Sequence, residues 1–238
     1  MYKYGVIFGD NHSYRDWGLV TKTRPVIGSP EPKTIYIDIP EADGQLDLTE
    51  SLTGEVKFKN RQIKCEFIVL EARNKWTSIY SKVMNYLHGQ KLKIIFDEEP
   101  NHYYLGRIKV DEWSSNKKTS TLVISGEVEP YKYEVSNSLE PWEWDIFNFE
   151  DDCIREYANL EVNGELYFTI YGSRKSVIPT FIVTTDDGVG LQLVFEGEAY
   201  NLPDGTNRII NVTIRDGEHH LKFIGNGTVS IKYQGGCL

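Results

Sequence analysis

Alternation of apolar and polar residues runs through most of this 238-residue chain and constrains its fold more than any other feature. Such alternation is typical of a β-strand with one buried face, because successive side chains of a strand point to opposite sides. A composition rich in tyrosine and poor in methionine agrees with a β-rich protein. We therefore predict a mainly β fold, in which the N-terminal half has strands near residues 2–8, 34–39, 61–71, 92–96, 103–110 and 121–128.

Residues 74–88 differ, because their apolar side chains recur at spacings of three and four. This spacing places them on one face of an α-helix. Asn74 suits the N-cap, and Gly89 stands where a left-handed residue often ends a helix. We predict one helix at about 74–88, with an apolar face formed by Trp76, Ile79, Tyr80, Val83, Met84 and Leu87.

The distribution of charge divides the chain into two parts. The formal net charge of −9 lies entirely in residues 139–238, because residues 1–138 contain 19 basic and 19 acidic side chains. A sharp change in charge balance indicates a domain boundary. We predict two domains, 1–138 and 139–238, and the regular short strands of the second one indicate a β-sandwich or jelly roll. Within the second domain, Asn163-Gly164 predicts a hairpin turn, and alternation over Ile210–Ile214 predicts a strand.

The stretch from Asp43 to Arg61 combines turns with alternating segments. Asp43-Gly44 is typical of a tight turn, and Leu46 and Leu48 then alternate with polar residues, which predicts a strand with one buried face. Its charges are mixed, and we expect them to be exposed.

Motifs that would indicate catalysis or a cofactor are absent from the sequence. His219 and His220 are adjacent, so on a strand they would point to opposite faces and would not bind one metal. Asp43, Asp47 and Glu50 lack the alternating spacing of a calcium loop. We therefore predict no enzyme, no cofactor and no metal site.

The number of cysteines and the length of the apolar runs indicate the compartment of the protein and whether it contacts a membrane. Three well-separated cysteines indicate free thiols in a reducing compartment. No apolar run is long enough for a membrane span, and the first residues do not have the pattern of a signal peptide. We expect a protein without membrane contact.

Aromatic and acidic residues are mixed after residue 139, where Trp142 and Trp144 are candidate partner-binding aromatics. The segment suits either a linker or an exposed aromatic patch. Exposed aromatics also stack on sugars, so a carbohydrate-binding baseplate or cell-surface module is the alternative function. Further candidates for sugar contact are Tyr167, Tyr171, Tyr200 and Tyr233.

Several motifs occur in a characteristic order over about residues 1–135. They are Asp16-Trp17-Gly18-Leu19, Asp43-Gly44, Leu46–Glu50, Gly54, Asn60-Arg61, a Trp-led helix ending in Leu87-His88-Gly89, Phe96–Pro100, Tyr103–Arg107 and Glu129-Pro130-Tyr131. In this order they resemble the distal tail protein (Dit) family of siphophages and prophages. The C-terminal part is similar only in its strand pattern and its ending.

The resemblance implies a structural hub of a phage tail tip or baseplate. In the family, an N-terminal tail-tube-like β-sandwich with one helix forms a hexameric ring, and a galectin-like C-terminal β-sandwich projects from it. The ring joins the tail tube protein to the tail-associated or fibre protein, and DNA passes through its lumen without specific binding. The resemblance also implies that the C-terminal domain is where a receptor-binding or other baseplate protein attaches. The residues with which true galectins hold sugars are not found after Trp144.

The resemblance also implies where such a protein is found. It would be made in the bacterial host cytoplasm and would be located at the virion tail tip. A closed ring needs a heterologous interface. We expect the Asp43–Arg61 stretch to form part of this interface, with Asp47, Glu50 and Arg61 as contacts.

Overall fold

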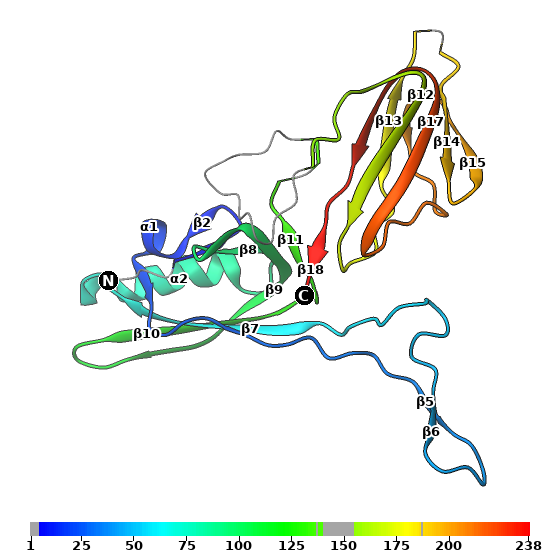
Figure 1. The fold of residues 1–238 in the computed structure, drawn as a ribbon. Helices are drawn as coiled ribbons and strands as arrows, with labels where there is room; N and C mark the ends of the chain where they lie inside the picture. The colour runs from blue at the N-terminus through cyan, green and yellow to red at the C-terminus, as the bar shows by residue number, and fades with distance from the viewer. Residues whose placement is uncertain (1–4, 137, 140–154, 187) are drawn as a thin grey trace. The chain divides into compact units, whose positions relative to one another are not determined.

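The computed structural model in Figure 1 describes residues 5–136, 138–139, 155–186 and 188–238. The chain divides into two compact units. Unit 1 contains residues 1–99, 103–132 and 238, and unit 2 contains residues 100–102 and 133–237. The boundary predicted at 138–139 falls within unit 2, shortly after the chain enters it at Tyr133.

Unit 1 is built on a curled antiparallel sheet with the strand order β2-β1-β8-β9-β10-β7-β3 (Figure 1). Strand β4, Val26–Ile27, also pairs with β7. A separate two-stranded sheet is formed by β5, Tyr36–Asp38, and β6, Gln45–Asp47. The strands of the main path are β1 Val6–Phe8, β2 Asn11–His12, β3 Leu19–Thr21, β7 Arg61–Val69, β8 Lys91–Phe96, β9 Glu99–Ser115 and β10 Ser120–Val128.

Strand β7 shows why the sequence folds in this way. Its side chains alternate as predicted, so that Ile63, Cys65, Phe67 and Val69 are buried while Gln62 and its neighbours on the other face are more exposed. Burial of one aliphatic or aromatic side chain contributes about 1.5–3 kcal/mol, so this face stabilises the unit substantially. Pairing with β10 over its whole length fixes the register.

The predicted helix is α2, Trp76–Leu87, preceded by a 3₁₀ turn, η1, at Arg73–Lys75. It packs its apolar face on the sheet through Val83 and Leu87, which are fully buried. The expectation that Asn74 caps the helix is wrong, because Asn74 lies inside the 3₁₀ turn and no side chain caps α2. Gly89 adopts a φ of 79°, as the predicted left-handed end requires.

A second, short helix was not expected. Helix α1 covers Ser13–Trp17, and the Nδ1 atom of His12 accepts hydrogen bonds from the main-chain N–H groups of Tyr14 and Arg15. Histidine is not among the usual N-cap residues, so this cap could not be predicted from local residue preferences. Gly18 ends the helix with a φ of 64°.

Unit 2 is organised around β17, Gly217–Lys232, which pairs along one edge with β12, Leu160–Gly172. On its other edge, the first part of β17 pairs with β14, Leu191–Phe195, and the last part pairs with β13, Thr180–Thr184. The outer strands are β15 Glu198–Leu202 and β16 Gly205–Asn207. The two halves therefore curl around one apolar core, which confirms a β-sandwich or jelly-roll type of fold. The remaining two strands, β11 Lys132–Glu134 and β18 Gly236–Cys237, pair with each other.

The hairpin predicted at Asn163-Gly164 is wrong. Both residues lie in the middle of β12, opposite Asn226 and Gly225 of β17. Gly164 has a φ of 80°, and its N–H donates to the Oδ1 atom of Asn226, 3.0 Å away. Left-handed glycines inside paired strands mark a bulge or a bend, so the same dipeptide here bends a long strand pair between the two halves.

The strand predicted over Ile210–Ile214 is also wrong. Val212 and Ile214 are buried, but Ile210 is exposed, and among the described residues this segment forms only the isolated bridge of Ile214 with Val177. Val212 and Ile214 pack into the core from a loop. Alternating apolar residues can therefore be buried without belonging to a paired strand.

Candidate assembly site on the projecting arm

Residues 31–59 form an arm that leaves the sheet of unit 1 just before β7 and carries β5 and β6 (Figure 1). At its base the two chain segments are joined by the bridge Pro32–Phe58 and by hydrogen bonds between Lys33 and Lys57 and between Lys59 and Glu31. Every residue from 31 to 47 is exposed. The arm is thus ordered by its own pairing, with little cover from the rest of unit 1.

The β5–β6 hairpin has one apolar and one polar face. Its register pairs Ile37 with Leu46 and Tyr36 with Asp47. Because side chains alternate along a strand, Ile35, Ile37 and Ile39 share a face with Leu46. These four side chains are 45–47% exposed.

The sequence predicted that this alternating face is buried. Within the chain that prediction is wrong, because the hairpin projects from the sheet and no described element covers it. Clustered exposed apolar side chains of this kind mark an interaction surface.

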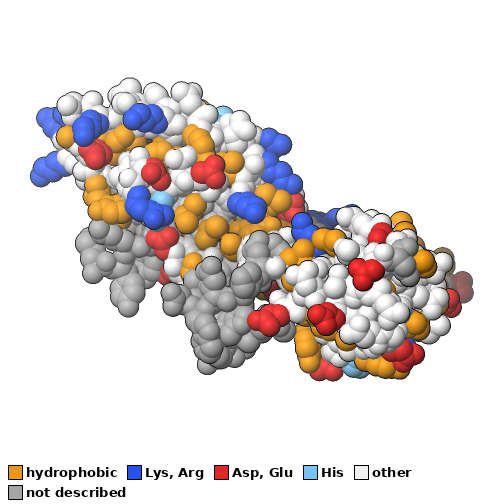
Figure 2. All heavy atoms as spheres, turned by 90° about the horizontal axis from the view of Figure 1, so that it is seen from above, with side chains coloured by type: hydrophobic (Ala, Val, Ile, Leu, Met, Phe, Trp, Pro, Cys, Tyr) orange, Lys and Arg blue, Asp and Glu red, His pale blue; other side chains and the backbone are white. Residues whose placement is uncertain are grey.

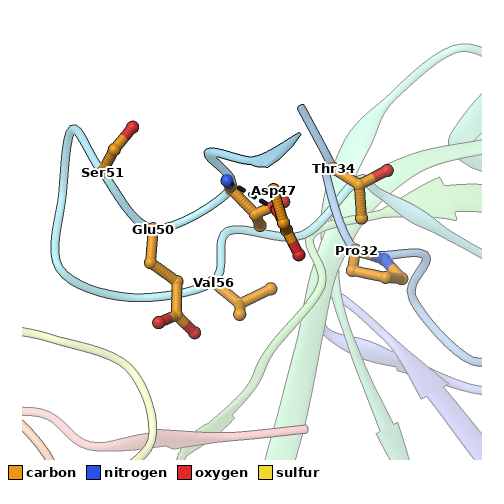
Figure 3. Close-up of a pocket in the computed structure, with 7 residues that line it drawn as sticks. Pro32, Thr34, Asp47, Glu50, Ser51 and Val56 are labelled. Atoms are coloured by element: carbon orange, nitrogen blue, oxygen red, sulfur yellow. Dashed lines mark hydrogen bonds between the residues drawn. The ribbon is translucent and has the colours of Figure 1, made fainter. Parts of the chain in front are cut away.

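The base of the hairpin encloses a hollow of about 580 Å³. Asp47 and Glu50 both line it, and Val56 lies between them (Figure 3). Hydrogen bonds from the hydroxyl and main-chain N–H groups of Thr49 hold the pKa of Asp47 below its ordinary value. Two of the three predicted contact residues are therefore brought together, on an exposed and negatively charged part of the arm.

Arg61 is not part of this surface. It is only 6% exposed, its Nε atom donates to the carbonyl oxygen of Pro130 at 2.8 Å, and its guanidinium lies 5.2 Å from the ring centroid of Tyr104. The expectation that Arg61 is exposed is wrong, because the side chain turns inward at the start of β7 and binds the chain after β10.

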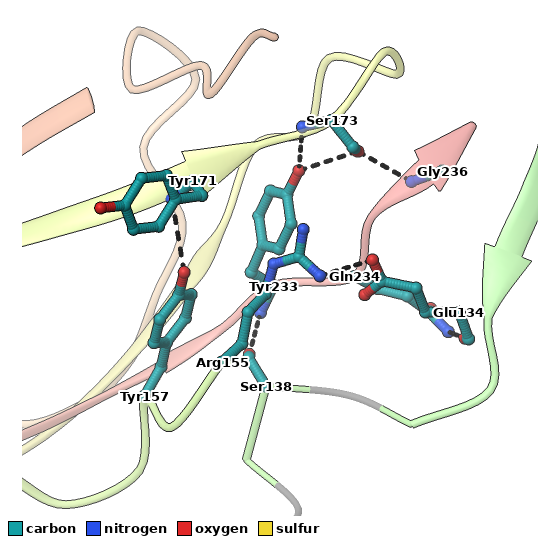
Figure 4. Close-up of polar contacts among 9 residues, drawn as sticks. All are labelled: Glu134, Ser138, Arg155, Tyr157, Tyr171, Ser173, Tyr233, Gln234 and Gly236. Atoms are coloured by element: carbon teal, nitrogen blue, oxygen red, sulfur yellow. Dashed lines mark hydrogen bonds and ion pairs between the residues drawn. The ribbon is translucent and has the colours of Figure 1, made fainter. Parts of the chain in front are cut away.

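Unit 2 contains a polar cluster that was not predicted from the sequence (Figure 4). The buried hydroxyl of Ser138 donates to the carbonyl oxygen of Ile231 at 2.6 Å and accepts from the N–H of Tyr233 at 2.7 Å. Arg155 forms an ion pair with Glu134 and lies 5.2 Å from the ring centroid of Tyr233. Burial raises the pKa of the Tyr233 hydroxyl, whose oxygen accepts from the N–H of Ser173. These partners are far apart in the sequence, so no local pattern indicates them.

The partner-binding candidates Trp142 and Trp144 lie outside the described residues. Among the tyrosines suggested for sugar contact, Tyr233 is buried in the cluster above and Tyr200 is half-buried. Tyr167 is 71% exposed on β12, and Tyr171 is exposed on the same face.

No protein-family model and no curated protein matches the sequence. Among solved structures this chain is similar to SPP1 Dit, described as a paradigm of the hub adsorption apparatus in phages that infect Gram-positive hosts. The TM-score is 0.57 at 10% identity, over 97% of this chain and 98% of that chain. The chain has the fold of SPP1 Dit.

The similarity to SPP1 Dit covers both units, including the C-terminal part in which the sequence motifs were weakest. The Dit-type fold expected from the ordered motifs is therefore confirmed. A second structure, a conserved protein of unknown function from Pseudomonas aeruginosa PAO1, has a TM-score of only 0.27 at 10% identity, over 90% of this chain and 100% of that chain. Such a score is too low to indicate a common fold.

No group of three or more potential metal ligands occurs within the described ranges. His219 contacts the main chain of Arg215, and His220 contacts the hydroxyl of Thr169 instead. No described helix is long and apolar enough to cross a membrane.

Proposed function

We propose that this protein is a distal tail protein, the structural hub of a siphophage or prophage tail tip. In this role six copies form a ring between the tail tube protein and the tail-associated or fibre protein. The observation that carries the proposal is the similarity to a phage hub protein along nearly the whole chain. The protein acts by assembly and has no catalytic role.

The arm supports the ring part of this proposal. A hairpin with a bare apolar face is costly in water unless a partner covers it. In a ring of identical subunits each copy offers its arm to the next one, which is the heterologous contact that ring closure requires. Asp47 and Glu50, on the same arm, are the charged contacts of this interface.

DNA passage requires a wall that does not hold phosphates. On the outer face of the unit 1 sheet, Lys64 pairs with Glu66 at 3.3 Å and Lys109 pairs with Asp111 at 2.8 Å. Cations that are already paired give little of the counterion release on which tight DNA binding depends. If this face of the sheet lines the lumen, its paired cations favour passage of DNA without specific binding.

The remaining partners follow from the same role. Unit 2 is the domain to which a receptor-binding protein would attach, and the whole protein is located at the virion tail tip after synthesis in the host cytoplasm. No contact with a membrane is part of this function.

Sizing with light scattering over a range of concentrations, followed by negative-stain imaging, tests the proposal. The expected result is a hexamer with a central hole, in equilibrium with monomer. A variant in which residues 34–56 are replaced by a short Gly-Ser turn should stay monomeric with both units folded. A wild-type protein that remains monomeric at every concentration, or a variant that still forms rings, would contradict this assembly.

One observation favours a second candidate, carbohydrate binding by unit 2. The Nζ atom of Lys222 lies 5.1 Å from the ring centroid of Tyr167, and the hydroxyl of Tyr167 donates to the Oε2 atom of Glu165 at 3.2 Å. These two contacts hold the ring in place. Lys222 and Glu165 also pair at 2.7 Å. A fixed exposed ring beside such polar groups suits stacking on a sugar. Calorimetry with host cell-wall polysaccharide tests this candidate, and heat of binding that is lost in Tyr167→Ala would support it.

A further inference from the structure

Charge is distributed unevenly within unit 1. The arm, residues 31–59, contains seven acidic and three basic side chains and has a net charge of −4. The rest of unit 1 contains sixteen basic and eleven acidic side chains and has a net charge of +5. The near-neutral total for this half of the chain thus hides an acidic arm attached to a basic body.

The arm and one group of cations lie at opposite ends of β7. The arm joins β7 at Arg61, whereas the other end of β7, at Ile68, pairs with Thr121 next to the turn between β9 and β10. That turn carries Lys117 and Lys118, and η1 begins with Arg73 soon after β7 ends. Nine residues of strand span about 27 Å, so the arm's base and these cations are well separated within one copy.

The far end of unit 1 combines free cations with an apolar residue. Arg73, Lys117 and Lys118 are exposed, and none of them forms an ion pair within the described part of the chain. Leu70, directly after β7, is 59% exposed. We name Leu70, Arg73, Lys117 and Lys118 the basic end. In Figure 2, Lys and Arg side chains are spread over the face of unit 1 that is in view.

The basic end is a fixed structure. Trp113, close to the β9–β10 turn, stacks on Tyr80 of α2 with ring centroids 4.7 Å apart and planes at 16°. Its Nε1 atom also donates to the hydroxyl of Ser120 at 2.7 Å. These contacts hold the turn beside the helix, so the cations are presented in place before any partner binds, which lowers the entropy lost on binding.

We propose that the basic end of unit 1 receives the acidic arm of a neighbouring copy, so that copies join head to tail. The inference rests on the proposed ring and names the surface that the arm contacts. The occupant is a second copy because the arm and the basic end are complementary. The arm has the apolar side chains Ile37 and Leu46 among acidic residues, and the basic end has the apolar side chain Leu70 among cations. Because the arm's base and the basic end lie at opposite ends of β7, each copy can give its arm to one neighbour and receive an arm from the other. Such a contact is heterologous and can close into a ring.

Two sets of charge reversals test the contact. The arm variant carries Asp43→Lys, Asp47→Lys and Glu50→Lys, and the end variant carries Arg73→Glu, Lys117→Glu and Lys118→Glu. All six side chains are at the surface, so both variants should fold like the wild type by circular dichroism. Each variant alone brings like charges together and should raise the concentration at which half the protein is assembled by about tenfold or more.

Mixing the two variants is the decisive measurement. In the mixture, the basic arm of one variant meets the acidic end of the other, and the remaining contact has its natural charges. Light scattering should therefore show that assembly returns toward the wild-type concentration. A matched control variant with Arg174→Glu, Arg208→Glu and Lys232→Glu, all exposed in unit 2, should assemble like the wild type.

The outcomes separate this inference from the ring itself. If the wild type forms rings but the mixture does not recover, or the end variant assembles normally, the arm contacts another surface and the inference is wrong while the ring stands. If the wild type never assembles, both are wrong.

Discussion

The main-chain N–H of Tyr157 donates to the carbonyl oxygen of Ser138 at 3.0 Å, so the chain on either side of residues 139–156 meets at one point. The N–H of Ile231 in turn donates to the carbonyl oxygen of Tyr157 at 2.8 Å, which fixes this point to β17. The intervening segment is therefore not needed to carry the chain from unit 1 to unit 2.

Replacing residues 140–154 with a short Gly-Ser linker should leave unit 2 folded. Loop-closure entropy changes slowly with loop length, so the expected change in stability is within about 1 kcal/mol. Thermal unfolding followed by circular dichroism measures it. Adding Ser138→Ala, which leaves the buried N–H of Tyr233 without its acceptor, should lower the stability of the shortened protein by about 1–3 kcal/mol. Loss of the fold on shortening alone would contradict the role assigned to the Tyr157–Ser138 bond.

The apolar face of the arm should matter for assembly and hardly at all for folding. Ile37→Ser with Leu46→Ser changes two exposed side chains, so the free energy of unfolding should change by less than about 0.5 kcal/mol per site. Self-association should weaken strongly, because the covered apolar area is lost. Sedimentation velocity measures association. Val189→Ser with Ile210→Ser removes comparable exposed apolar surface from unit 2, and association of this control should equal that of the wild type.

We expect Arg61 to stabilise the fold of unit 1 and to have no part in ring assembly. Arg61→Ala leaves the carbonyl oxygen of Pro130 without its guanidinium donor and removes the contact with Tyr104, so unit 1 should lose about 1–3 kcal/mol. Urea unfolding measures this loss in a Trp142→Phe/Trp144→Phe background, which leaves only the tryptophans of unit 1. Asp47→Asn, on the exposed arm, should give an unchanged midpoint. If the Arg61→Ala protein has normal stability but fails to assemble, this prediction is wrong and Arg61 is a contact of the subunit interface.

The sequence predicted those features that depend on local pattern. Alternation in β7 identified its buried face correctly, and spacing in α2 identified the helix. The same alternation in Ile37 and Leu46 shows that a face has to be covered, but it does not say whether the cover comes from the same chain. The structure answers this question, because among the described strands β5 and β6 pair only with each other and the arm projects from the sheet.

The errors at Asn163-Gly164 and at Arg61 have a common physical cause, which is the choice of partner at long range. Asn163-Gly164 has the local preference of a tight turn, yet pairing of β12 with β17 uses it as a bend. Ser138 contacts Tyr233 across 95 positions, and Arg61 contacts Pro130 across 69. No spacing rule covers such distances, so the polar cluster in unit 2 and the inward orientation of Arg61 became visible only in the fold.

Cys65 gives a pH-dependent test of the unit 1 core. Burial among apolar side chains raises the pKa of its thiol from 9.0 to about 12, because the thiolate cannot be solvated there. Between these two values the unfolded chain releases a proton that the folded chain keeps. The unfolded state is therefore favoured as the pH rises, by about 1.4 kcal/mol per pH unit, whereas below pH 9 this thiol contributes no pH dependence. Urea unfolding in the Trp142→Phe/Trp144→Phe background should show a steeper loss of stability between pH 9 and pH 11 for the protein with Cys65 than for Cys65→Ala. The comparison cancels the titration of tyrosines and lysines common to both proteins, and equal slopes would show that Cys65 ionises freely in the folded state.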